Sequence, residues 1–218
     1  MPWLIFAALF VGYALVAHVR HKENPQDKLV PTISQMVDGF KRAAFEPDKR
    51  TNEYRLLVDT AASTKRFLVS LFILSLVGVL LGLHMGSMPY FERLFYRFVL
   101  FFDKTPALAL LPILFIIFGL GEVSKIALIV IGVTPTIVLD TYLRARSVPR
   151  EQVVKALTLG ASDFEVVYKV VLPRIFPKVL DTIRLNFKAI VLFLIAGEAL
   201  AAVAGLGYRI FLVRRYVA

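Results

Sequence analysis

The chain has 218 residues, of which 58% are hydrophobic and only 19% charged, and it contains no cysteine. A soluble chain is usually about 45–50% apolar, and a single core of this size could not bury the excess, so the composition argues against a soluble enzyme. The absence of cysteine excludes disulfides and Cys-based metal sites, and three histidines are too few for a His-rich metal site.

The formal net charge of +10 fits either a nucleic-acid binder or a membrane protein with cationic flanks on its spans. The aromatic residues lie mostly inside apolar runs and are not interleaved with the basic residues. We therefore expect a lipid bilayer as the environment and no nucleic acid as a partner.

The N-terminal residues 1–20 contain a first apolar run, 3–19, long enough for about one bilayer crossing. No basic residue precedes the run and no small-residue cleavage site follows it, so we predict a transmembrane helix and not a signal peptide. The next segment, 21–63, is polar, and the apolar spacing between Ser34 and Ala44 predicts a short amphipathic helix on the membrane surface.

The remaining unit, residues 64–218, contains four more apolar runs. These are residues 67–83, 95–118, 123–139 and 183–204. The sequence thus predicts an all-α membrane protein, a polytopic transmembrane helix bundle with about five spans. In the second span Gly78, Gly82 and Gly86 share one face at four-residue spacing, which predicts close packing of another helix there.

Charged residues lie inside several of these runs, among them Asp103 and Lys104 in the third span and Glu198 in the fifth. A charge at mid-membrane costs about 2.5–3.5 kcal/mol on insertion scales, so it normally faces protein or water. These three residues are candidates for a translocation pathway. Ion pairing between helices, or snorkelling to the headgroups, is the competing interpretation.

Residues 147–173, which we call the knob, have the signals of two helices joined by a tight turn. For the first helix we predict Ser147 as the N-cap and Gly160 as the stop. Its apolar residues Val153, Val154 and Leu157 are expected on one side.

A capping box formed by Ser162 and Glu165 predicts the start of the second, short helix of the knob, and Pro173 its end. The knob should therefore be rigid enough to transmit force from a docked partner. An ordinary amphipathic linker is the alternative.

The knob also resembles the coupling loop of bacterial ABC-importer permeases. The family pattern is Glu-Ala-Ala, three residues, Gly, nine residues, Ile-x-Leu-Pro. Here it reads Val154-Lys155-Ala156, three residues, Gly160, nine residues, Val170-x-Leu172-Pro173. Further matches, at residues 106–112, 118–125, 146–148, 197–198 and 205–208, resemble the nitrate/sulfonate/taurine branch.

This chain departs from the family pattern at three places. The usual acid of the coupling signature is replaced by Val154, which puts one charged contact to the ATPase in doubt. The branch usually has Arg-Pro where this chain has Asp103-Lys104. Family members also usually continue past Tyr208 into a sixth span.

The resemblance implies the type I ABC-importer permease fold in the bacterial inner (plasma) membrane. It implies two cytoplasmic ATPase subunits, a second permease copy in a homodimer or heterodimer, and a periplasmic or lipid-anchored substrate-binding protein. The residues expected to contact the ATPase are Val154, Lys155, Ala156, Leu159, Gly160, Ala161, Ser162, Asp163, Leu172 and Pro173.

The chain itself is not expected to be an enzyme, because its sequence contains no Gly-x-x-x-x-Gly-Lys-Ser/Thr. ATP and Mg²⁺ would bind the partner ATPase, and we expect no cofactor or metal in this chain. A small anion such as a sulfonate, taurine, nitrate or bicarbonate is the expected solute.

The sequence leaves open both the orientation of the chain in the membrane and its class of function. Residues 20–66 hold ten Lys and Arg and residues 141–188 hold nine. The two segments lie on opposite sides of the membrane, so nearly equal numbers of basic residues mean that the positive-inside rule does not decide which side is cytoplasmic. Only the resemblance places the knob in the cytoplasm. The rival functions are an ATPase-independent channel or secondary transporter, a membrane-embedded enzyme, and a non-transporting membrane scaffold.

Overall fold

The computed structural model describes residues 2–23, 30–48 and 52–217, and within these ranges all regular structure is helical. The helices are α1 (Pro2–Glu23), α2 (Ile33–Phe45), α3 (Arg55–Ser87), α4 (Pro89–Lys104), η1 (Ala107–Leu110), α5 (Leu111–Phe118), α6 (Glu122–Arg146), α7 (Arg150–Thr158), α8 (Asp163–Glu165), η2 (Val166–Val171), α9 (Leu172–Leu185), α10 (Phe187–Ala201) and α11 (Leu206–Val217).

Three of the described helices are long and apolar enough to cross a membrane alone, namely those at Trp3–Lys22, Arg55–Ser87 and Glu122–Arg146. Two bent helix pairs raise the number of candidate spans to five. The predicted all-α helix bundle is therefore confirmed, with three to five candidate spans.

The third predicted span is not a single helix, because α4 and the η1–α5 segment meet at 92°. Thr105 has an extended backbone, with φ −84° and ψ 127°, and Pro106 follows it. A residue before proline is disfavoured in the α conformation, so α4 ends at Lys104 and the chain turns sideways.

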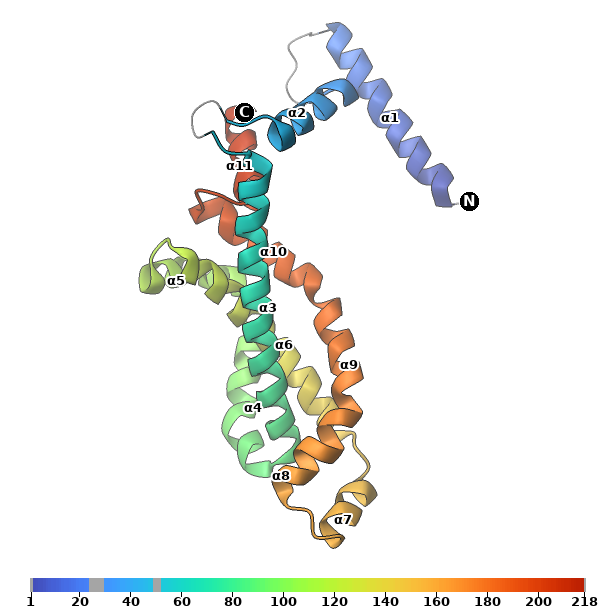
Figure 1. Cartoon of the computed structure of the whole chain (residues 1–218), viewed down its shortest axis with the longest axis vertical. Helices are drawn as coiled ribbons and strands as arrows, with labels where there is room; N and C mark the ends of the chain where they lie inside the picture. Colours follow the sequence, from blue (N-terminus) through green and yellow to red (C-terminus); the bar gives the residue numbers. More distant parts are fainter. Residues whose placement is uncertain (1, 24–29, 49–51, 218) are drawn as a thin grey trace.

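The knob and the N-terminal helices lie at opposite ends of the molecule (Figure 1). Helix α3 runs along the long axis, with α4, α6 and α9 beside its lower half, and α7 and α8 form the lower tip. Helices α1 and α2 lie at the upper end, where α1 stands away from the bundle. The thirteen-residue α2 occupies the place predicted for the amphipathic helix, begins with a capping box at Thr32 and buries none of its residues.

The centre of the bundle is the contact between α3 and α6. A Cβ built on Gly78 would lie 2.7 Å from Ile137, one on Gly82 2.7 Å from Thr141, and one on Gly86 2.5 Å from Ala145. The partners advance by four residues along both helices, so α3 and α6 run parallel and in register. The structure thus places α6 against the predicted glycine face, where only the missing side chains allow the two backbones to approach this closely.

We predict that Gly82→Ala lowers the free energy of unfolding by about 2–3 kcal/mol, because its methyl group would lie 2.5 Å from the carbonyl oxygen of Val138. A backbone carbonyl of α6 cannot avoid the added methyl group by changing its rotamer, as a side chain could. Thermal unfolding in detergent measures the effect. The matched control is Gly39→Ala on α2, where a Cβ meets nothing within 4 Å; equal melting temperatures for the two variants would contradict the packing argument.

Candidate functional site

The first half of the knob begins two residues later than the sequence indicates. Ser147 is the C-cap of α6, where its hydroxyl donates to the Arg144 carbonyl at 2.7 Å, so its predicted role as the N-cap of α7 is wrong. Because α6 extends to Arg146, Ser147 caps the C-terminus of that helix and lies too early in the chain to cap the N-terminus of α7. Pro149 takes the N-cap position of α7, without a side-chain cap.

The predicted apolar face of α7 is also split. Val153 packs inward on the bundle together with Ala156, whereas Val154 and Leu157 are 56% and 42% exposed. Successive residues of an α-helix lie about 100° apart, so Val153 and Val154 cannot both face the core. Apolar side chains of α7 are therefore left on the outer surface of the knob.

Gly160 forms the turn between the two halves, as the sequence predicts. Its φ is +91°, the left-handed conformation that glycine adopts without steric cost. The Gly160 N–H donates to the Leu157 carbonyl at 2.9 Å and the Ala161 N–H to the Ala156 carbonyl at 3.1 Å. This pair of hydrogen bonds is the Schellman motif, which gives the turn one defined geometry.

The second half begins with the predicted capping box. The Ser162 hydroxyl accepts from the Glu165 N–H at 3.3 Å, and the Glu165 carboxylate accepts from the Ser162 N–H at 3.0 Å. The predicted stop at Pro173 is wrong, because the chain continues through the π-helical η2 into α9. A proline lacks its N–H but is tolerated in the first turn of a helix, which is where Pro173 lies.

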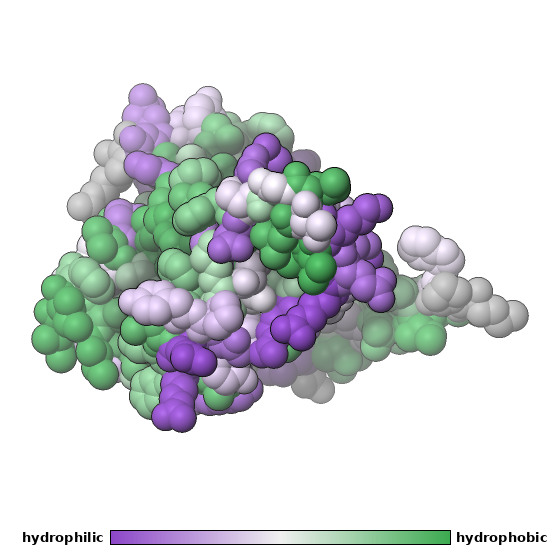
Figure 2. Space-filling model, turned by 90° about the horizontal axis from the view of Figure 1, so that it is seen from below, coloured by the Kyte–Doolittle hydropathy of each residue, from purple (hydrophilic) through white to green (hydrophobic). Residues whose placement is uncertain are grey.

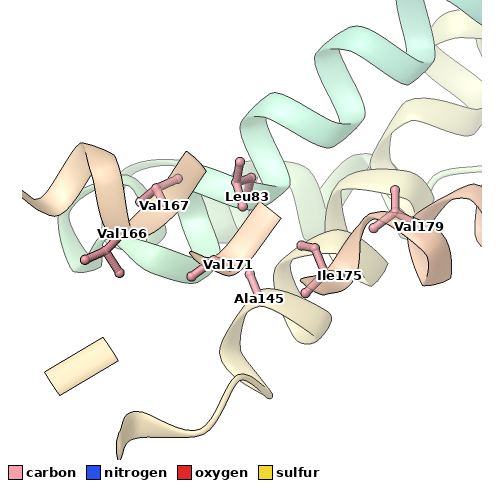
Figure 3. Packing of buried hydrophobic residues seen from close by; sticks show 7 residues of the cluster. All are labelled: Leu83, Ala145, Val166, Val167, Val171, Ile175 and Val179. Atoms are coloured by element: carbon pink, nitrogen blue, oxygen red, sulfur yellow. The ribbon is translucent and has the colours of Figure 1, made fainter. Parts of the chain in front are cut away.

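The π-helical segment holds the knob against the bundle. Figure 3 shows Val166, Val167 and Val171 packed with Leu83 of α3 and Ala145 of α6. All five side chains are at most 5% exposed. A displacement of the knob would therefore act directly on the neighbouring ends of the two central helices.

The outer surface of the knob combines apolar and charged side chains. Leu159 is 80% exposed and Phe164 63% exposed. Seen from the knob end, Figure 2 shows hydrophobic and hydrophilic residues side by side. Of the predicted contact residues, Val154, Lys155, Leu159, Gly160, Ser162, Asp163 and Pro173 are exposed, while Ala156, Ala161 and Leu172 are half-buried.

The structure separates the three candidate pathway residues. Asp103 and Lys104 end α4, where the lysine ammonium lies 3.0 Å from the aspartate carboxylate. Asp103 also accepts from the Thr136 hydroxyl of α6 at 3.0 Å. The Lys104 side chain is 75% exposed, whereas that of Glu198 is fully buried.

Glu198 belongs to an ionic cluster with Arg66 and Glu122, in which Glu198 and Arg66 are buried and Glu122 is 56% exposed. The Arg66 guanidinium lies 2.6 Å from the Glu198 carboxylate and 2.5 Å from that of Glu122. Lys125 donates to the other oxygen of Glu122 at 2.9 Å. The cluster therefore ties α3, α6 and α10 together at the end away from the knob.

The same cluster fixes the turn between α10 and α11. The Gly207 N–H donates to Glu198 at 2.8 Å, and the Leu206 N–H to the Ser63 hydroxyl at 2.9 Å. Asp59 accepts from the Gly205 N–H at 2.9 Å and from Arg209 at 2.6 Å. Sequence reasoning missed Asp59, Ser63 and Arg66; a polar residue at each helical turn before the apolar stretch was the available signal.

A sequence profile of binding-protein-dependent transport system inner membrane components matches residues 75–217, which include α6, the knob and the Glu198 region. The chain belongs to this family. The resemblance to ABC-importer permeases is thereby confirmed, and the chain is a multi-pass membrane protein of that family.

The chain is also similar in sequence to individual permeases. Over 150 residues the chain is 33% identical to the taurine transport system permease protein of Escherichia coli, covering 69% of this chain and 54% of that protein. It is 33% identical over 182 residues to a putative ABC transporter permease protein of Methanocaldococcus jannaschii, covering 83% and 68%. It is 31% identical over 117 residues to a putative aliphatic sulfonates transport permease protein of Escherichia coli, covering 54% and 44%. The chain thus spans about half the length of the taurine permease, and the predicted taurine and sulfonate branch is confirmed.

In this permease-family chain we predict that Arg66→Met lowers the free energy of unfolding by about 3–5 kcal/mol, because it leaves the buried Glu198 without its cation. Lys169→Met is the control, since its pair with Glu165 has 71% and 45% exposed side chains and should be worth at most about 1 kcal/mol. Thermal unfolding in detergent separates the two; a similar melting temperature for both would mean that the cluster contributes little to stability.

Proposed function

We propose that this chain is the permease subunit of an ATP-driven importer for a small anion of the sulfonate class, with taurine as the first candidate. The observation that carries the proposal is the knob, a helix–glycine–helix unit anchored by Val166, Val167 and Val171 to the ends of α3 and α6. Family membership and the taurine and sulfonate relatives support the class of solute.

The knob is the proposed docking element for a separate ATPase. Its exposed apolar side chains, Leu159 and Phe164 among them, are suited to a groove on a partner, while its charged residues would fix orientation. Because the Gly160 turn and the capping box leave the knob few ways to deform, a push on it would move α3 and α6. Closure of an ATPase dimer would then shift the helices between outward-open and inward-open states.

The remaining parts of the assembly follow from this assignment. ATP and Mg²⁺ would be held by two ATPase subunits, and this chain would pair with a second permease copy. A periplasmic or lipid-anchored binding protein would deliver the solute. With the knob in the cytoplasm of a bacterium, the polar segment 21–63 would lie outside the inner membrane; the described helix of this segment, α2, lies at the end of the molecule opposite the knob (Figure 1).

We predict that Leu159→Cys crosslinks to the co-encoded ATPase when a short bismaleimide is added to inside-out vesicles. The chain has no cysteine of its own, so the introduced thiol is its single reactive group. Phe45→Cys on α2 is the matched control, because it is 72% exposed but at the far end of the molecule. An adduct with Phe45→Cys alone, or with neither variant, would refute the proposed docking.

We predict that Gly160→Val reduces taurine-stimulated ATPase activity at least tenfold in the assembled importer, because a side chain with φ near +91° is strained and the turn must change shape. Nothing lies within 4 Å of a Cβ at Gly160, so the effect would come from the backbone and not from a clash. Gly12→Val in α1, with equally open surroundings, is the control. Full stimulation in an intact Gly160→Val complex would rule out the rigid-turn mechanism.

A further inference from the structure

Three cations lie in a row along α4. Arg93, Arg97 and Lys104 are separated by four and seven residues, a spacing that places them on one face of the helix. All three are exposed. We call them the basic stripe.

The upper end of the basic stripe is level with the apolar stretch of α3. The neighbour of Lys104, Asp103, bonds to Thr136, which precedes the Ile137 that lies against Gly78 of α3. Gly78 is well inside the uncharged stretch 67–83, so Lys104 is level with the interior of the bilayer. Arg97 and Arg93 are about 10 and 16 Å nearer the knob end at 1.5 Å per residue.

The basic stripe faces neither of the helices on which α4 packs. Toward α3, α4 presents Phe91, whose ring centroid lies 5.3 Å from that of His84. Toward α6 it presents Tyr96, whose ring lies 5.4 Å from that of Tyr142. At about 100° per residue, Asp103, which bonds to Thr136 of α6, lies a quarter turn from Lys104, and Phe91 lies on nearly the opposite side of the helix from Arg93, so the stripe occupies a third side of the helix.

A lysine this exposed cannot face hydrocarbon at that depth. Charged side chains within a membrane face protein or a water-filled cavity, or extend to the headgroups, and Lys104 is the member of the stripe farthest from the knob-side headgroups. In the described part of the chain Arg93 and Arg97 have no salt bridge, so both charges are available to a ligand. The stripe is therefore a row of cations with a polar environment on its open side.

The polar surface continues from α4 onto α6 and α9. Asp140 and Arg144 follow Thr136 at four-residue spacing and pair with each other at 2.5 Å. Thr182 of α9 accepts from Arg144 at 3.0 Å and donates to Asp140 at 2.5 Å. Hydrogen bonds thus connect α4, α6 and α9 along a side of α6 different from the one that packs on α3.

We propose that the basic stripe of Arg93, Arg97 and Lys104 lines the knob-side half of a water-filled pathway and conducts anions through it. The inference rests on the proposed function, whose solute class it refines to species with a sulfonate or similar anionic group. Several weak cationic sites in a row suit conduction, since a solute must enter and also leave. Lys104, already paired with Asp103, would hold an anion less strongly than Arg97 and Arg93, so affinity would rise toward the knob end.

The test measures thiol modification in membranes that contain the complete importer. Lys104→Cys is treated with two small methanethiosulfonates, one carrying a sulfonate and one a quaternary ammonium. Leu76→Cys is the depth control, because Leu76 is 48% exposed on α3, close to Gly78, and lines an apolar groove between α3 and α9. We expect Lys104→Cys to react at least tenfold faster than Leu76→Cys.

Charge selectivity is tested by adding Arg93→Gln and Arg97→Gln to Lys104→Cys. The ratio of sulfonate to ammonium reaction rates should fall at least fivefold, and adding Arg93→Lys and Arg97→Lys instead should preserve it. Adding Lys65→Gln, an exposed lysine of α3 before the apolar stretch, should leave the ratio unchanged.

Two results would overturn the inference. Equal, slow modification of Lys104→Cys and Leu76→Cys would mean that the stripe faces lipid and that its arginines bind headgroup phosphates. Rapid modification with an unchanged rate ratio after arginine removal would mean a pathway without anion selectivity from the stripe. Either result leaves crosslinking of Leu159→Cys to the ATPase intact, so failure here is distinguishable from failure of the proposed function.

Discussion

The close parallel contact of α3 and α6 is the constraint on which the rest of the structure depends. Gly78, Gly82 and Gly86 let the two backbones meet, and the register set by these glycines runs to both ends of the contact. At one end it brings Arg66 to Glu122, and at the other it places Leu83 beside Ala145, under the knob. A single helix pair therefore joins the ionic cluster around Arg66 to the element that we propose receives force.

The two ends of this helix pair are stabilised by different kinds of interaction, apolar packing at one end and charged hydrogen bonds at the other. At the knob end, valines of η2 pack on α3 and α6, an apolar contact whose strength depends on area and not on exact angle. At the other end, Glu198 is fully buried and its carboxylate is satisfied by Arg66, Ser63 and the Gly207 N–H. Such a directional, charged network tolerates little movement. The charge cluster thus suits a fixed pivot and the valine contact a moving end.

Local signals in the sequence were sufficient for the helical class, the Gly160 turn and the Ser162 capping box, because each depends on a few neighbouring residues. They failed where an outcome depends on how far the adjacent helix extends. Ser147 has the chemistry of an N-cap but serves the end of α6, and Pro173 has the chemistry of a stop but lies in a first turn. The ion pair of Arg66 and Glu198 joins residues far apart in the chain, and no local pattern specifies such a partner.

Two neighbouring helices that point the same way oblige the chain between them to return across the bilayer. The sixteen residues of α4 are about 24 Å long, less than the roughly 30 Å of hydrocarbon, and the 92° bend then sends η1 and α5 sideways before the chain reaches α6. At the bend the chain supplies its own partners, because the Thr105 N–H donates to the Phe102 carbonyl at 3.2 Å and the Thr105 hydroxyl to the Phe101 carbonyl at 2.8 Å. The link between the two parallel helices is therefore a short helix and a sideways segment joined at a corner, and not a further straight span.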